Sequence, residues 1–265
     1  MNRKLDRKRI GIGIATVCLV SVVATVFNPN RKLPLHELFN PYHWVEHYEG
    51  RDIYDARWNF LGHGDPHIPE VAMTFDDGPD INNEPAIVKV LKEKHVPATF
   101  FLVGIRIKQH PELVKLLADN GFGIGNHTYD HKRLDALKPH EIANELRLCD
   151  KHIFEITGKH PFLMRPPGMQ YNNKVLNVAR ALGYVTVYWN VGARDYEVVP
   201  KNFIVERVID RTENGSIILL HQDQPSTAQA LPEIIDGLRA QGYTFVSLPH
   251  MLRQLHVQIP PVPRD

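Results

Sequence analysis

The sequence is poor in cysteine and carries almost no net charge. Its two cysteines, Cys18 and Cys149, lie in unrelated segments, so they predict no disulfide framework. Lys and Arg number 31 against 30 Asp and Glu, and the formal net charge is +1. Residues 1–32 hold seven basic residues and one acidic residue, which leaves 24 basic and 29 acidic residues in the remainder. A chain of this kind lacks the basic surface expected of a nucleic-acid-binding protein, and we expect no nucleic-acid partner.

Long apolar runs are also scarce, apart from one near the N-terminus. Residues 10–27 form an uncharged run of 18 residues behind a basic stub at 1–9. This length approaches the roughly 20 residues of a membrane-spanning helix. The basic residues ahead of it predict that the following chain is exported. We interpret residues 10–27 as a transmembrane signal anchor, with a cleaved signal peptide as the alternative. The rest of the chain is then expected at a bacterial cell surface or in the periplasm, or secreted if the signal is cleaved.

The organisation of the chain changes at residue 70. Residues 28–69 are rich in proline, histidine and aromatic residues and have weak periodicity, so we interpret them as a linker and N-terminal extension. Strand-like and helical patterns then alternate through residues 70–255, and residues 256–265 form a loose tail. The strand-like runs are 71–77, 98–104, 123–128, 162–168, 185–192, 216–222 and 243–249.

This alternation predicts βαβ units and a parallel sheet that is buried on both faces. We expect an α/β fold: a distorted (β/α) barrel of about seven parallel strands, preceded by the membrane-anchor helix. A doubly wound open sheet is the alternative. Glycine should end three of the helices, at Gly121, Gly183 and Gly242.

Polar side chains with catalytic chemistry follow five of the predicted strands. In barrels built from βα units, catalytic groups gather where the strands end. The residues at these positions are Asp76, Asp77, His127, His131, Arg165, Asp195 and His221. The sequence therefore predicts one polar site at that edge of the sheet.

The spacing of His127 and His131 in HTYDH indicates a metal site. Four residues apart on a helical turn, both imidazoles would lie on one face and share an ion. The chain holds 15 histidines, and two other segments with this spacing lack a strand-end acid. A zinc protease is not indicated, because its motif needs Glu directly after the first His. Two histidines and one carboxylate form a familiar zinc set, in which Asp76 or Asp77 would bind the ion and the other would act as a base on water.

These segments resemble the motifs of a known family, the polysaccharide deacetylases (carbohydrate esterase family 4, with a NodB-homology domain). TFDDGP at 74–79 matches the first motif outright, and HTYDH at 127–131 matches the second. RPPG at 165–168 resembles the third motif, RDY at 194–196 partly resembles the fourth, and ILLH at 218–221 resembles the fifth. The resemblance covers roughly residues 70–250 and identifies residues 70–255 as a NodB-like catalytic domain.

The resemblance implies how the two acidic residues divide their work. Asp76 would be the general base, and Arg165 would pair with it and keep it ionised. Asp77 would bind the metal together with His127 and His131. The ion would be a single divalent metal, Zn²⁺ by preference, although Co²⁺ or Ni²⁺ fit the same ligands.

The resemblance also assigns the remaining site residues. His221 would be the general acid that protonates the leaving amine, and Asp195 would tune its pKa. The backbone N–H near Gly168 would form part of an oxyanion hole, while Tyr196 and Leu219 would line the pocket for the acetyl group. The fourth motif usually reads Asp-x-x-Asp-Trp; here its first Asp is absent and Tyr196 replaces the Trp. We expect these differences to affect substrate preference more than activity.

The expected activity is metal-dependent hydrolysis of N-acetyl groups on N-acetylglucosamine-type residues of an extracytoplasmic polysaccharide, such as peptidoglycan or a chitin-like glycan. Two alternatives keep the chemistry: an O-acetyl esterase on xylan-type glycan, or an amidohydrolase on a small cyclic amide. A third alternative is a catalytically retired member that binds glycan without turnover. The expected partners are an N-acetylated glycan and, through residues 10–27, a membrane.

Overall fold

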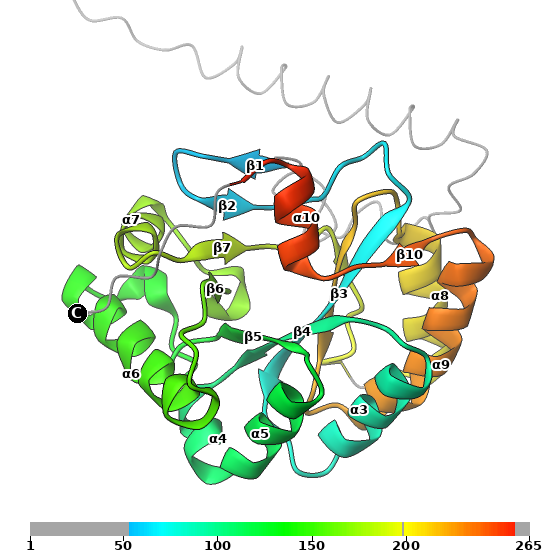
Figure 1. The fold of residues 1–265 in the computed structure, drawn as a ribbon, viewed down its shortest axis with the longest axis horizontal. Helices are drawn as coiled ribbons and strands as arrows, with labels where there is room; N and C mark the ends of the chain where they lie inside the picture. The colour runs from blue at the N-terminus through cyan, green and yellow to red at the C-terminus, as the bar shows by residue number, and fades with distance from the viewer. Residues whose placement is uncertain (1–52, 198, 258–265) are drawn as a thin grey trace, which may run out of the picture. The chain divides into compact units, whose positions relative to one another are not determined.

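A curled, mixed β-sheet lies at the centre of the described chain. The computed structural model describes residues 53–197 and 199–257 (Figure 1). The strands are β1 (Tyr54–Asp55), β2 (Phe60–Leu61), β3 (Glu70–Gly78), β4 (Ala98–Leu102), β5 (Gly123–Asn126), β6 (Leu163–Met164), β7 (Val185–Val187), β8 (Val191–Gly192), β9 (Ile217–His221) and β10 (Thr244–Phe245). Their hydrogen-bonded order is β1-β2-β7-β6-β5-β4-β3-β9-β8, and β10 pairs with β3. Only β1 and β2 pair antiparallel among the strands described.

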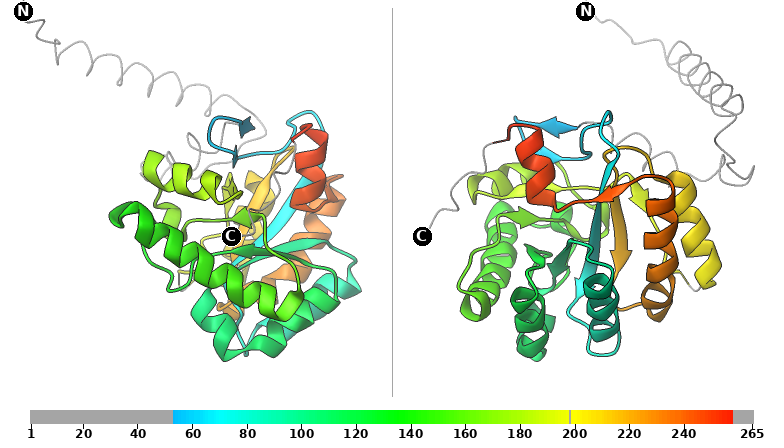
Figure 2. Two further views of the ribbon diagram at one scale, coloured as in Figure 1. Left: turned by 60° about the vertical axis from the view of Figure 1, so that its left-hand side comes forward. Right: turned by 45° about the vertical axis from the view of Figure 1, so that its right-hand side comes forward.

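Helices lie around this sheet, most of them on its outer side (Figure 2). They are α3 (Glu84–Glu93), α4 (Gly104–Gln109), α5 (Pro111–Asp119), α6 (Pro139–Thr157), α7 (Asn173–Ala181), α8 (Lys201–Arg211), α9 (Pro225–Ala240) and α10 (Leu248–Gln254), with 3₁₀ turns η2 (Leu134–Ala136) and η3 (Pro167–Met169). The sequence of α5 illustrates why they form. It begins with a proline, which is well suited to a first helical position, and buries Leu113, Val114 and Leu117 along one face.

The sheet curls round without closing through hydrogen bonds. Strands β7 and β8 follow each other with only residues 188–190 between them. They nevertheless lie near opposite ends of the hydrogen-bonded path, with β1 and β2 continuing beyond β7. The short connection keeps the two ends of the path close together. The result is a distorted, incompletely closed barrel.

Alternate residues of β3 face two different layers. Val71, Met73 and Phe75 pack with the buried faces of the outer helices. Ala72, between them, belongs to a second cluster that includes Phe101 from β4 and Leu219 from β9 and fills the inner side of the sheet. Because side chains alternate along a strand, Thr74 and Asp76 continue the inner row.

The α/β fold and the gathering of parallel strands agree with the prediction, but the strand count is wrong in detail. Strands β1 and β2 lie before residue 70. Strand β2 pairs parallel with β7, and the antiparallel pairing of β1 with β2 makes the sheet mixed. The predicted strand at 185–192 is divided into β7 and β8 by residues 188–190. The predicted strand at 243–249 contributes only Thr244 and Phe245, since α10 begins at Leu248. Helix α4, which the sequence analysis does not anticipate, follows β4 directly.

The glycine stops are confirmed. Gly121, Gly183 and Gly242 have φ angles of 76°, 80° and 92°, in the left-handed region that glycine enters without steric cost. Each follows the end of a helix, as expected from the helix C-terminal pattern.

Several expectations fall on residues outside the described part of the chain. The basic stub at 1–9, the anchor at 10–27, most of the extension at 28–69 and all but two residues of the tail belong to this group. Within residues 53–197 and 199–257, no helix has the length and apolar character needed to cross a membrane. The anchor therefore stays a prediction.

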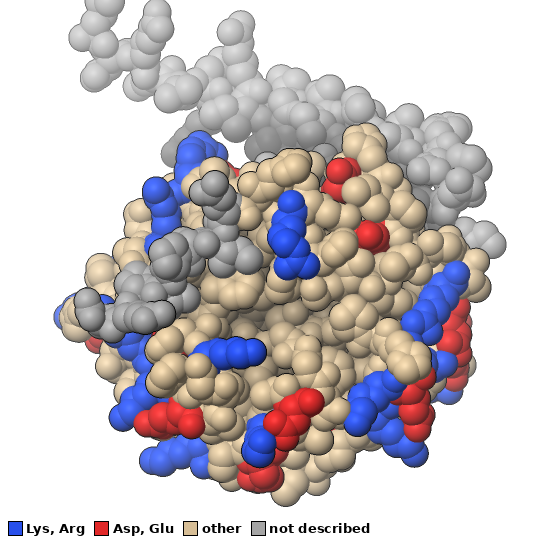
Figure 3. Space-filling view, viewed as in Figure 1, with Lys and Arg blue, Asp and Glu red and all other residues tan. Residues whose placement is uncertain are grey.

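Charged side chains of both signs intermingle on the face seen in Figure 3. Lys, Arg, Asp and Glu lie mainly towards its edges, and the centre is mostly uncharged. Ion pairs on the described surface join Lys94 to Asp236 at 2.6 Å and Lys201 to Glu233 at 2.5 Å. Such exposed pairs contribute little to stability, roughly 0–1 kcal/mol each.

Candidate active site

Two adjacent carboxylates, Asp76 and Asp77, reach the same site from the end of β3. Asp76 points to the inner side of the sheet by the alternation of the strand and is 3% exposed. Asp77 has a φ of 67°, and the pairing of β3 with β4 shifts register between Phe75 and Gly78. This bulge breaks the alternation, so Asp77 does not turn to the opposite face as the next residue of a regular strand would.

Two imidazoles converge on one oxygen of Asp77. His127 follows β5, and its Nε2 lies 3.3 Å from Asp77 Oδ1; Nε2 of His131 lies 2.9 Å from the same atom. The expectation of a helical turn is wrong, because residues 127–133 form neither helix nor strand. Thr128 and His131 instead have φ angles of 68° and 56°. The convergence of the two rings is achieved by this bent loop.

The three residues fit a divalent metal ion. One ligand atom from each of Asp77, His127 and His131 lies within 4.8 Å of the others. Tetrahedral zinc with bonds of about 2.0–2.1 Å places its ligand atoms about 3.3 Å apart. Asp77 Oδ1 is buried and accepts no hydrogen bond of regular geometry from the described residues, although both imidazoles are near. An ion between them would satisfy this oxygen.

The protonation of these ligands also suits a metal. Burial acts to raise the pKa of the Asp77 carboxyl, but its contacts with His127 and His131 outweigh burial and hold the pKa below its usual range. Nδ1 of His127 lies 2.8 Å from the carbonyl oxygen of Arg165, which fixes Nδ1 as the donor and leaves Nε2 as the ligand atom.

Arg165 holds Asp76 from the inner side of the sheet. Its guanidinium is fully buried and donates to Asp76 Oδ1 at 2.7 Å and to Thr74 Oγ1 at 2.9 Å. The carbonyl of Val187 accepts from Arg165 Nε at 3.2 Å, and the ring of Phe101 lies 4.3 Å from the guanidinium carbon. A buried charge is tolerated only with such partners. Arg165 therefore fixes the position of the Asp76 carboxylate.

A second unit, built around His221, stands beside the first. His221 ends β9 and is paired in register with Asp76 of β3. Its Nδ1 lies 2.7 Å from Asp195 Oδ1, and its backbone N–H donates to Asp195 Oδ2 at 2.7 Å. The hydroxyl of Thr227 also donates to Asp195 Oδ2. Burial acts to lower the pKa of His221, but the charge of Asp195 outweighs it and raises the pKa to about 9.

Three predicted site residues remain: Tyr196, Leu219 and Gly168. Tyr196 is half exposed and presents its ring edge-on to His221, with ring centres 5.5 Å apart. Leu219 is buried on the inner side of β9 and is paired in register with Thr74. Gly168 lies in η3 after β6, with an exposed backbone and a φ of 58°. Roles for these three in substrate binding stay predictions.

The sequence analysis missed several supporting residues, because they come from distant segments. Arg106 at the start of α4 donates to the carbonyl of Asp77 and to Asp223 Oδ2 at 3.2 Å, which restrains the bulge. Thr227 on α9 orients Asp195. A signal was available only for Thr74, which stands two residues before Asp76 and therefore shares its strand face.

Glu84 and Gln222 form a buried pair behind the turn at Gly78. The amide nitrogen of Gln222 donates to Glu84 Oε2 at 2.6 Å, and its oxygen accepts from the N–H of Gly78 at 3.2 Å. Burial raises the pKa of Glu84 to about 8. Gln222 also fills the space that only glycine leaves: a Cβ on Gly78 would lie 1.9 Å from an atom of the Gln222 side-chain amide.

Replacing Gly78 with alanine is therefore expected to lower the free energy of unfolding by about 1–3 kcal/mol, the usual cost of overpacking a buried site. Urea unfolding should show a lower midpoint with an unchanged slope. The double variant with Gln222→Ala supplies the control. It removes the clashing side chain, so its loss should be smaller than the sum of the two single losses; strictly additive losses would contradict the role given to Gln222.

The chain is similar to known proteins of one family. A family model described as "Polysaccharide deacetylase" matches residues 63–187. The chain is 37% identical over 191 residues to a peptidoglycan-N-acetylglucosamine deacetylase of Bacillus cereus, covering 70% of this chain and 89% of the relative. It is 34% identical over 194 residues to the peptidoglycan-N-acetylmuramic acid deacetylase PdaA of Bacillus subtilis, covering 72% and 74%. The crystal structure of the Bc1960 peptidoglycan N-acetylglucosamine deacetylase, in complex with 4-naphthalen-1-yl-N-oxidanyl-benzamide, superposes with a TM-score of 0.73 at 32% identity, covering 83% of this chain and 99% of that one.

Proposed function

The chain belongs to the polysaccharide deacetylase family, and from this premise we propose that it is a metal-dependent N-deacetylase of an extracytoplasmic polysaccharide. Peptidoglycan is the favoured polymer, because both relatives described above are named for it. Those names differ in the sugar, N-acetylglucosamine in one and N-acetylmuramic acid in the other. We propose N-acetylglucosamine-type residues, with a chitin-like glycan as the second choice.

One observation carries this proposal: Asp76 and His221, each held by a buried ionic partner, lie side by side in register on neighbouring strands. Asp76, held by Arg165, lies next to a three-residue set suited to a metal ion. His221, held by Asp195, is paired in register with Asp76, and neighbouring strands lie about 4.8 Å apart. A base and an acid on either side of one reacting group are what hydrolysis of an amide requires.

Asp76 is proposed to act as the general base. Its Oδ1 is engaged by Arg165, whereas Oδ2 lies 3.7 Å from Nε2 of His127 and so faces the metal set. Oδ2 is thus the atom placed to accept a proton from the attacking water. Bound by Asp77, His127 and His131, a divalent ion would supply a Lewis acid that polarises the amide carbonyl and lowers the pKa of water.

His221 is proposed to act as the general acid. Its Nδ1 is committed to Asp195, which leaves Nε2 to donate a proton to the nitrogen of the departing amine. An amine leaves poorly unless it is protonated, so a histidine that keeps its proton at neutral pH is suited to the task. Its pKa of about 9 means that the imidazolium predominates at neutral pH.

The pH dependence of the reaction should report on this pair. Activity should fall above about pH 9 as His221 loses its proton, and Asp195→Asn should move this fall towards the ordinary histidine pKa of 6.5. Stability should follow the same group: its contribution is complete below 6.5 and is lost as the pH rises through about 9. The measurement is kcat against pH for both proteins, with the folded fraction checked at each pH. An alkaline limb that Asp195→Asn leaves in place would remove Asp195 from this role.

Acetate release tests the proposed reaction and its substrate. The protein, supplied with Zn²⁺, is incubated with peptidoglycan, chitin oligomers and acetylated xylan, and free acetate is measured. We expect release from the first two polymers, fastest from peptidoglycan. Fastest release from acetylated xylan would instead indicate an O-acetyl esterase. If no glycan released acetate while one zinc was bound per chain, the deacetylase proposal would be wrong.

The place of action is proposed from the sequence. We propose that residues 10–27 anchor the protein in a membrane and that the catalytic domain, proposed at 70–255, works outside the cytoplasm. A glycan of the cell wall is available only there. Cell fractionation and protease treatment of intact spheroplasts test this proposal. The protein should be found in the membrane fraction, and protease added outside the spheroplasts should cleave it.

A further inference from the structure

The loop that carries His131 adopts a conformation that needs external support. It runs from the end of β5 to η2, and Thr128 and His131 in it have φ angles of 68° and 56°. Residues other than glycine lose roughly 1–3 kcal/mol in such backbone conformations, which persist only when the surroundings impose them. The two metal-binding histidines of this loop differ in their surroundings: the side chain of His127 is 2% exposed, whereas that of His131 is 44% exposed. Packing alone therefore fixes His131 less firmly than His127.

Glu145 of α6 binds the backbone of this loop. Its Oε2 accepts from the backbone N–H groups of Tyr129 and Asp130, at 3.1 Å and 2.9 Å. Its Oε1 accepts from Lys132 Nζ at 3.0 Å. The residue is only 4% exposed, and a carboxylate so deeply buried is rare without partners of this kind. Both carboxylate oxygens of Glu145 therefore accept hydrogen bonds from residues close to His131 in the chain.

Other contacts hold the loop at further backbone groups. The N–H groups of Gly104 and Ile105, at the start of α4, donate to the carbonyls of Thr128 and Tyr129, both at 2.9 Å. Asn126 accepts from the N–H of Thr128 at 2.9 Å. These contacts fix the early part of the loop, while Glu145 acts on the residues directly before and after His131.

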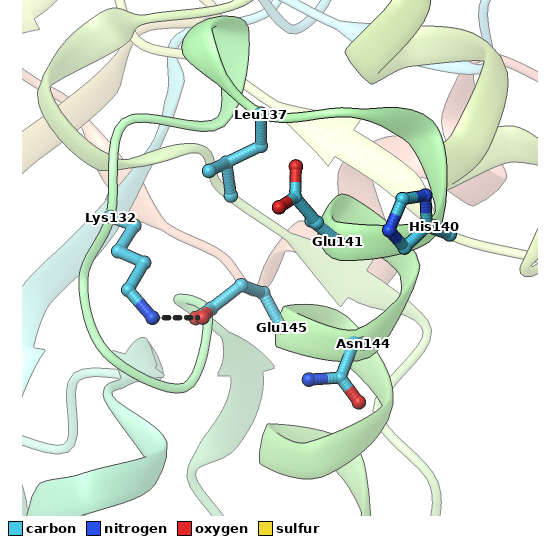
Figure 4. A pocket seen from close by; sticks show the side chains of 6 residues that line it. All are labelled: Lys132, Leu137, His140, Glu141, Asn144 and Glu145. Carbon is cyan, nitrogen blue, oxygen red and sulfur yellow. Dashed lines mark hydrogen bonds and ion pairs between the residues drawn. The ribbon is translucent and has the colours of Figure 1, made fainter.

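Glu145 and its partner Lys132 lie at the edge of a pocket. Figure 4 shows its carboxylate directed towards Lys132 beside a pocket of about 490 Å³. The pocket is lined by Lys132, Leu137, His140, Glu141, Asn144 and Glu145. The carboxylate of Glu145 reaches the loop backbone at the edge of this pocket.

We propose that Glu145 is a positioning residue that sets the affinity of the protein for its metal ion by holding the His131 loop in its ligand geometry. The inference rests on the metal site of the proposed function. Outer partners that orient metal ligands typically change metal affinity by about 10- to 100-fold when they are lost. Glu145 acts on the metal ligand His131 through the backbone of the loop. Its replacement should therefore leave the positions of Asp76 and His221 unchanged.

The test measures metal affinity in the full-length protein. Binding of Zn²⁺ is followed by competition with a chromophoric chelator, and binding of Co²⁺ by its visible spectrum, for wild type, Glu145→Ala and Glu145→Gln. We expect Glu145→Ala to weaken affinity about 10- to 100-fold. Glu145→Gln should be intermediate, since one amide oxygen can still accept from the loop. At saturating metal both variants should regain most of the wild-type kcat.

Glu155→Gln is the matched control, because Glu155 lies on the same helix with a side chain that is 52% exposed. It should bind metal like the wild type. If Glu145→Ala fails to fold, Glu145→Gln carries the test alone. Wild-type affinity in folded Glu145→Gln and Glu145→Ala, with only the unfolding midpoint of the metal-free protein lowered, would show a merely structural residue and overturn the inference. A wild-type protein that binds no metal would instead overturn the proposed function, and this inference with it.

Discussion

Replacement of His127 by alanine is expected to abolish metal binding and acetate release together. His127 is buried, its Nε2 faces Asp77 Oδ1 at 3.3 Å, and its Nδ1 is fixed by the carbonyl of Arg165. Loss of the ring leaves two ligands, one of which, His131, lies on a more exposed loop. Metal affinity should fall by more than about 100-fold, which is the upper end of the range for residues that only orient a metal ligand. Metal content after dialysis and acetate release from peptidoglycan measure the two effects.

A nearby histidine outside the set provides the control for His127→Ala. His152 on α6 stacks on Tyr129 with ring centres 5.8 Å apart, so it borders the same loop without facing Asp77. His152→Ala should retain metal and activity. A His127→Ala protein that still bound one zinc tightly and released acetate would place the metal elsewhere.

Asp76→Asn is expected to remove activity while the metal remains. The amide keeps the size of the carboxylate but cannot take a proton from water, so kcat should fall by about 10²- to 10⁴-fold, the usual contribution of a general base. Arg165 would then lack its charge partner in a fully buried position. Such a loss destabilises proteins by roughly 3–5 kcal/mol, so the folded fraction must be measured beside kcat and metal content.

The comparison of Asp76→Asn with Asp77→Asn separates the roles of the two adjacent acids. Asp77→Asn should lose metal, since its Oδ1 is the atom shared by His127 and His131. If Asp76→Asn stripped the metal and Asp77→Asn kept it, the assignment of base and ligand would be reversed. We expect Asp77→Asn, and not Asp76→Asn, to lose the metal, because Arg165 already occupies Asp76 Oδ1.

The sequence allows prediction of the site because the fold brings strand ends together. Asp76, His127, Arg165 and His221 each follow or end a strand of the curled sheet, and neighbouring parallel strands present their ends at one edge. The spacing of His127 and His131 left open whether Asp76 or Asp77 joins them, and the family resemblance assigned Asp77. The structure brings Asp77, His127 and His131 together, but not in the way the spacing suggested. The His127–His131 pair is joined by a bent loop with two positive φ angles, not by a helical turn. A period of four residues cannot distinguish these conformations when the loop is held by distant groups.

The features that escaped prediction depend on contacts between distant segments. Strands β1 and β2 have two residues each, too short for the alternation that marks a strand, and exist through pairing with each other and with β7. Glu145 looks like an ordinary polar residue of a helix until the fold places it against the backbone of Tyr129. Thr227 similarly gains its meaning only from Asp195, 32 residues away in the chain.

We propose that one divalent ion, held by Asp77, His127 and His131, works with Asp76 to hydrolyse an acetamide. The most direct measurement is a titration of the metal-depleted full-length protein with Zn²⁺, in which bound zinc and the initial rate of acetate release from peptidoglycan are followed together. We expect a rate near zero without metal, a linear rise, and saturation at one zinc per chain, with no such rise for His127→Ala. Full activity in the metal-depleted wild type, or an equal rise in His127→Ala, would contradict it.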